Sequence, residues 1–84
     1  MKYQVSPEFA KLIGMTPNGP GGKYIYDRVK VQESFIQYAI KKGFVSEDSH
    51  VYDLSKEDFL MKELKVQNIH PKMLFSYLCK FLTK

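Results

Sequence analysis

The 84-residue chain has the length of one small domain, and 44% hydrophobic residues, including six Tyr and six Phe, provide enough apolar bulk for a core. Thirteen basic and nine acidic residues leave a formal net charge of +4. The apolar runs are too short to span a membrane, the first residues lack the apolar stretch of a secretory signal, and a single cysteine excludes an internal disulfide. We therefore expect one intracellular domain over residues 1–84, with no membrane partner.

The first residues predict a short helix followed by a loop. Ser6 and Pro7 are typical of a helix start, and Gly14 is typical of a helix end. These signals predict a helix over residues 7–13. Residues 16–22 contain two prolines and three glycines, a composition that favours a loop over regular structure.

A long second helix is predicted next. Residues 24–26 are typical of a short strand, and Asp27 can cap a helix that follows it. Apolar residues at helical spacing continue to Lys42, where basic side chains favour the helix end, and Gly43 is a suitable stop.

Two further helices are predicted in the second half of the chain. A polar turn at residues 46–49 and a short strand at 51–52 precede residues 55–58, which resemble a capping box for a helix carrying residues 59–64. Pro71 opens a fourth helix that runs to residue 82, with Asn68 or His70 as its cap. The apolar face of this helix comprises Leu74, Tyr77, Leu78, Phe81 and Leu82, and Phe75 and Cys79 extend it.

A weak internal duplication accompanies these elements. Residues 6–9 echo 55–59, and residues 35–41 echo 74–80. Each half then reads as a short capped helix, a connector and a long apolar helix. The pattern predicts two related helix pairs that pack on each other.

Several motifs resemble the SWIB domain family, which includes the peptide-binding domain of the Mdm ubiquitin ligases. Residues 6–14 are similar to the opening S-P-x-L-A-x-x-x-G of that family, Arg28 and Tyr38 have its spacing, and residues 51–53 match its I-x-x-D element. The resemblance covers about residues 3–83 and implies a single SWIB-like domain. The implied fold is mainly α with small β elements: an open four-helix bundle of two pseudo-repeats, capped by short β-strands.

The resemblance also implies a non-enzymatic interaction module in transcription or chromatin, which in the Mdm branch holds an amphipathic helix of a partner protein in a hydrophobic cleft. We expect such a module to be a monomer located in the nucleus or with the nucleoid. By position along the family pattern, the cleft residues are Phe35, Ile36, Ala39, Ile40, Ile69, Leu74, Tyr77 and Leu78. The competing interpretation is that these side chains form the core, because so small a domain needs most of its large apolar residues inside.

The alternative function is non-specific DNA binding by a lysine-rich face. The candidate residues are Arg28, Lys41, Lys42, Lys62, Lys65 and Lys80. Interspersed acidic residues also allow a dispersed, solvated surface. Because Arg28 is the only arginine and bidentate base contacts favour arginine, sequence-specific reading of DNA is not expected.

Catalysis has little support in the sequence. His50 lies in a polar turn and His70 precedes a proline at a helix start, while Cys79 is expected to be a buried, inert thiol on the apolar fourth helix. No Cys/His spacing predicts a zinc site, and the glycine-containing loop at residues 16–22 lacks the lysine-serine/threonine end of a phosphate-binding loop. We expect no catalytic residues, no metal and no cofactor.

Overall fold

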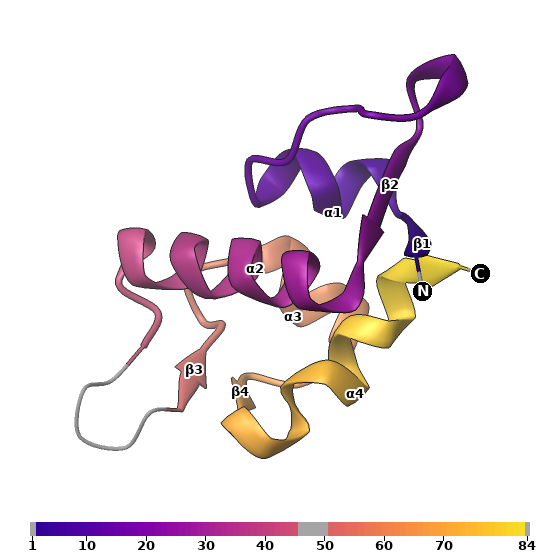
Figure 1. The fold of residues 1–84 in the computed structure, drawn as a ribbon. Helices are drawn as coiled ribbons and strands as arrows, with labels where there is room; N and C mark the ends of the chain where they lie inside the picture. Colours follow the sequence, from indigo (N-terminus) through magenta and orange to yellow (C-terminus); the bar gives the residue numbers. More distant parts are fainter. Residues whose placement is uncertain (1, 46–50, 84) are drawn as a thin grey trace.

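The computed structural model describes residues 2–45 and 51–83 (Figure 1). The elements in chain order are β1 (Lys2–Val5), α1 (Pro7–Leu12), a 3₁₀ turn (Pro20–Gly22), β2 (Tyr24–Asp27), α2 (Arg28–Lys42), β3 (Tyr52–Asp53), α3 (Asp58–Leu64), β4 (Asn68–Ile69), a 3₁₀ turn (Pro71–Met73), α4 (Leu74–Leu78), a 3₁₀ turn (Cys79–Phe81) and β5 (Leu82–Thr83). The long helix α2 lies between α1 and α4 in Figure 1 and forms the centre of the fold.

Two small antiparallel sheets connect segments that are distant in sequence. In the first, β1 is the central strand between β2 and β5, so both ends of the described chain lie in one sheet (Figure 1). Val5 is paired with Tyr24 on one side and with Leu82 on the other. In the second sheet, β3 pairs with β4, and Val45 forms a bridge to Tyr52.

Helix α2 forms where the sequence predicts it. The carboxylate of Asp27 accepts a 2.8 Å hydrogen bond from the backbone N–H of Lys30, which satisfies one of the free donors at the helix start. Gly43 ends the helix with φ of 76°, a left-handed conformation that glycine adopts without a steric penalty. The predictions of an Asp27 cap and a Gly43 stop are therefore confirmed.

The core lies between α1, α2 and the C-terminal segment. Phe9, which is fully buried, stacks on Phe81 with ring centroids 4.2 Å apart and the rings nearly parallel. Phe35 is also fully buried and meets the Tyr52 ring edge-on, with ring centroids 5.5 Å apart. These aromatic contacts join residues of both halves of the chain, so the two halves share one core.

The expected open four-helix bundle of pseudo-repeats capped by strands is wrong. Helices α1, α3 and α4 have six, seven and five residues, whereas α2 has 15, so the two predicted helix pairs are very unequal. Helices of one to two turns offer too little length for bundle packing. The structure is instead a mixed α and β fold, in which a three-stranded and a two-stranded antiparallel sheet are integral parts of the domain.

The predicted fourth helix is shorter than expected. Only Leu74–Leu78 is α-helical, and a 3₁₀ turn lies on each side of it. Leu82 is extended because it pairs with Val5 in the first sheet, a contact that ends the helical geometry. His70 caps the first of these turns, since its Nδ1 accepts a 3.3 Å hydrogen bond from the backbone of Lys72.

The predicted capping box at residues 55–58 is also wrong. Glu57 occupies the cap position of α3 and makes no side-chain cap bond, while the backbone N–H of Ser55 donates a 3.0 Å hydrogen bond to Asp53. Residue 55 therefore forms part of a turn with Asp53 and does not cap α3. The predicted polar turn at residues 46–49 lies outside the described residues.

Candidate functional site

Helix α2 presents three different surfaces because successive residues point about 100° apart around a helix. The first surface, Val31, Phe35 and Ala39, is buried in the core. The other two surfaces lie on either side of this buried one. One flank carries residues 36 and 40, and the other carries residues 30, 34, 37 and 41. The exposed apolar residues of α2 and its exposed polar residues therefore lie on different flanks of the helix.

Most of the predicted cleft residues belong to the core. Phe35, Ala39, Ile69, Leu74 and Leu78 are each at most 3% exposed. So small a domain needs most of its large apolar side chains in the core, and few remain to line a cleft. These five residues therefore lie in the core and do not line an open surface.

The remaining cleft candidates lie at or near the surface. Ile36 and Tyr77 are half-buried at the edge of the core, on two different helices. Ile40 is 59% exposed, and Val29, on the same flank of α2, is 58% exposed. Val29, Ile36 and Ile40 follow one another at spacings of seven and four residues, which places them on one line along the helix. We call these three residues the apolar stripe.

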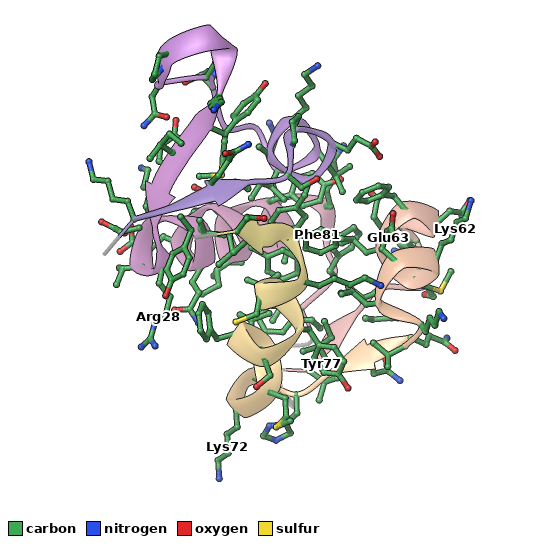
Figure 2. All side chains as sticks on the ribbon, turned by 90° about the vertical axis from the view of Figure 1, so that its right-hand side faces the viewer. Arg28, Lys62, Glu63, Lys72, Tyr77 and Phe81 are labelled. Carbon is green, nitrogen blue, oxygen red and sulfur yellow. The ribbon has the colours of Figure 1, made fainter. Side chains whose placement is uncertain are left out.

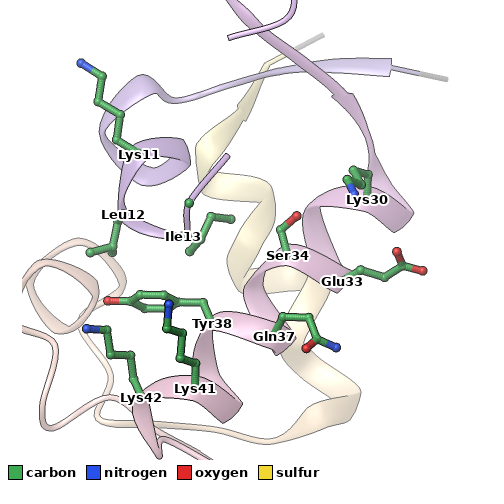
Figure 3. A pocket seen from close by; sticks show the side chains of 11 residues that line it. Lys11, Leu12, Ile13, Lys30, Glu33, Ser34, Gln37, Tyr38, Lys41 and Lys42 are labelled. Atoms are coloured by element: carbon green, nitrogen blue, oxygen red, sulfur yellow. The ribbon is translucent and has the colours of Figure 1, made fainter. Parts of the chain in front are cut away.

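An open concavity lies on the other flank of α2, where the helix meets α1 (Figure 3). Four lysines, Lys11, Lys30, Lys41 and Lys42, line it together with a single carboxylate, that of Glu33. The other lining residues are Leu12, Ile13, Gly14, Ser34, Gln37 and Tyr38. We call this open depression of about 1010 Å³ the lysine groove.

The ring of Tyr38 forms part of the wall of the lysine groove (Figure 3). The ammonium of Lys42 lies 6.0 Å from its centroid, and the hydroxyl donates a 2.8 Å hydrogen bond to Oε2 of Glu57. Burial, followed by the hydrogen bond to Glu57 and the negative charge of that carboxylate, raises the pKa of Tyr38 to about 12. The ring is therefore a neutral wall, held in place by Glu57 directly before α3.

The predicted DNA-binding residues do not form one face. Arg28 lies over the ring of Phe75, with 4.6 Å between the guanidinium carbon and the ring centroid, and it occupies the opposite side of Figure 2 from Lys62. The ammonium of Lys80 donates a hydrogen bond to the backbone carbonyl of Glu63 and lies 4.0 Å from its carboxylate. Lys65 ends α3 in a left-handed conformation.

Only Lys41 and Lys42 of the predicted set line the lysine groove. Lys11 and Lys30 also line it and were not among the predicted residues. The spacing of Lys30, Ser34, Gln37 and Lys41 could have revealed the α2 wall, because these residues lie three or four apart and share one flank. Lys11 enters only through the packing of α1 against α2, which no local pattern reports.

Chemistry other than binding has few candidates in residues 2–45 and 51–83. No group of three or more His, Cys, Asp or Glu residues there is close enough to hold a metal ion. Cys79 is exposed, contrary to expectation, because the 3₁₀ turn places it off the buried line of Leu74, Leu78 and Phe81. His50 lies outside the described residues.

None of the helices in the described part of the chain combines the length and the apolar character required to cross a bilayer. No protein-family model matches the sequence. No curated protein matches it either.

Proposed function

We propose that the chain is a non-enzymatic, SWIB-type interaction module of transcription or chromatin that docks an amphipathic helix of a partner protein on the apolar stripe. The proposal is supported by the SWIB-like motifs and by the exposure of Val29 and Ile40, at 58% and 59%. It relies on those residues and does not depend on the bundle architecture that the resemblance implied. Such a partner would bring the domain to DNA-associated complexes in the nucleus or nucleoid.

The geometry of the apolar stripe suits a helical partner. Val29 and Ile40 are 11 residues apart, about 16 Å along the helix axis at 1.5 Å per residue. A partner helix of three turns carries apolar anchors at matching spacing and can lie along this line. A straight apolar seam on a helix is the surface by which helices commonly pack against each other.

The contacts that hold α2 in place support this role. Arg28 at its start stacks on Phe75 of α4, and Tyr38 near its end is bonded to Glu57 beside α3. Both residues belong to the SWIB-like motif, and both orient the helix that carries the apolar stripe. Burying two or three apolar side chains at roughly 1.5–3 kcal/mol each supplies about 3–9 kcal/mol. Association costs at least about 4 kcal/mol, so we expect a Kd of about 0.1 mM or weaker.

The test is a titration of the ¹⁵N-labelled chain with a synthetic amphipathic helix of about 15 residues with leucine anchors at helical spacing. We expect amide shifts to be largest around Val29, Ile36 and Ile40. A Val29→Gln/Ile40→Gln variant removes apolar surface without changing charge, and it should weaken binding at least tenfold, equivalent to about 1.4 kcal/mol.

The matched control is Met73→Gln, because Met73 is 50% exposed but lies outside the apolar stripe. This variant should bind the peptide as the unmodified chain does. Equal weakening by the control and the stripe variant would contradict the proposal, as would shifts confined to other helices. Circular dichroism checks that each variant is folded.

A further inference from the structure

We infer that the lysine groove between α1 and α2 is a second, independent binding site, and that it takes the phosphate backbone of nucleic acid without reading its sequence. The site is on the opposite flank of α2 from the apolar stripe, and it shares no residue with that stripe. It also differs from the lysine face expected from the sequence, since Arg28, Lys62, Lys65 and Lys80 lie outside it.

The first support is the concentration of charge. The groove contains four lysines and one glutamate, a formal charge of 4 − 1 = +3, within a chain whose net charge is +4. All four lysines are exposed. The one ion pair that the described residues form within 4.0 Å joins Lys80 to Glu63. No carboxylate of the described residues therefore lies within that distance of a groove lysine. A concave surface lined by one sign of charge concentrates counterions of the other sign.

The second support is the arrangement of the groups along α2. Lys30, Ser34, Gln37 and Lys41 form a row about 16 Å long, with a lysine at each end and two neutral hydrogen-bonding side chains between them. At about 3.4 Å of duplex axis for each phosphate of one strand, that length spans four to five base-pair steps. A repeated charge on a long, regular ligand suits this row better than a single anion does.

The third support distinguishes phosphate from an acidic helix. A docked helix requires several open apolar anchor points, but of the two aliphatic side chains in the groove Ile13 is only 6% exposed and Leu12 is half-buried against the core. The exposed side chains of the groove are the four lysines, Gln37 and Glu33, and ammonium and amide groups are usual partners of phosphate oxygens. The groove contains no arginine, so bidentate contacts with bases are not available and binding should be independent of sequence.

The test measures binding of the full chain to a fluorescent duplex DNA of arbitrary sequence between about 50 and 200 mM salt. If four lysines each neutralise one phosphate, log K falls against log[salt] with a slope of about −3.6, and affinity drops about 10²-fold over this range. Lys30→Gln/Lys41→Gln should reduce the slope to about −1.8 and the drop to about tenfold. A second duplex of unrelated sequence should bind equally.

The matched control is Lys62→Gln/Lys72→Gln, which removes the same charge from exposed positions outside the groove (Figure 2). It should leave the slope close to that of the unmodified chain. Amide shifts on DNA addition should centre on Ser34 and Gln37, which gives a readout independent of the variants. The Val29→Gln/Ile40→Gln variant should bind DNA normally, so the two sites can fail separately.

Three outcomes would overturn the inference. The first is an equal decrease in the salt slope of log K in the groove variant and in its control, which would show that DNA binding depends only on the overall charge of the chain. The second is DNA affinity that does not change with salt. The third concerns polyglutamate, titrated as a model of an acidic protein. If Lys30→Gln/Lys41→Gln loses polyglutamate binding but keeps DNA binding, the groove binds an acidic protein instead.

Discussion

The hydroxyl of Tyr38 and the carboxylate of Glu57 form a 2.8 Å hydrogen bond that joins α2 to the first residue before α3. Removing the hydroxyl with Tyr38→Phe should lower the free energy of unfolding by about 1 kcal/mol near neutral pH, because a neutral donor to a half-buried carboxylate is lost. Urea unfolding followed by circular dichroism measures the difference. No change in stability would show that water replaces the bond at no cost.

The same pair predicts a dependence on alkaline pH. The pKa of Tyr38 is about 12 in the folded chain against an ordinary value of 10.0, so the unfolded chain loses this proton first. The contribution of Tyr38 to stability is therefore complete below pH 10 and is lost as the pH rises from 10 toward 12. The stability difference between the unmodified chain and Tyr38→Phe should shrink over that window. A constant difference would contradict the raised pKa.

Asp27 and Ser6 offer a direct comparison of two helix starts. Asp27→Ala should cost about 1 kcal/mol, since its side chain caps α2. Ser6 precedes α1 but makes no side-chain cap bond, and its backbone N–H donates to the carbonyl of Phe81, a bond that alanine retains. Ser6→Ala should therefore cost less than about 0.5 kcal/mol. Equal losses in urea unfolding would contradict the geometry of both caps.

Arg28 and Phe75 should be energetically coupled. A guanidinium 4.6 Å from a ring centroid contributes about 0.5–1 kcal/mol at a partly exposed site. The double-mutant cycle of Arg28→Gln and Phe75→Leu isolates this term, because each change removes one partner. Additive losses would show that the stacking contributes nothing and that another contact fixes α4 to the start of α2.

Phe9 should be among the most costly residues to truncate. It is fully buried and stacks on Phe81, so Phe9→Ala should cost about 3–5 kcal/mol. Phe59 lies 6.0 Å from the same ring but is only half-buried, and Phe59→Ala should cost clearly less. Denaturant midpoints measure both, and the reverse order would place the centre of the core elsewhere.

Features with local signals could be predicted from the sequence. The helix α2 was predicted with its cap and its end because Asp27 and Gly43 act on neighbouring backbone groups. Strand β2 was expected from three adjacent residues of high β propensity. The first sheet could not be predicted in the same way, because the pairing of β1 with β5 depends on residues almost a chain length apart.

The candidate sites show the same division. The apolar side chains of α2 are distributed over two neighbouring surfaces of the helix, and only the packing of the other elements decides that Phe35 is buried while Ile40 is exposed. The row of Lys30 and Lys41 follows from helical spacing, which the sequence contains. Its partner across the groove, Lys11, is placed by the packing of α1.

The position of β1 between β2 and β5 also sets an order of events during synthesis. Val5 cannot meet Leu82 until that residue has left the ribosome, so the first sheet stays incomplete while the chain is being made. Phe9 likewise waits for Phe81 before its stacking partner exists. The native state should therefore form only after translation has passed these positions, and ribosome-bound fragments ending before residue 81 should remain sensitive to protease.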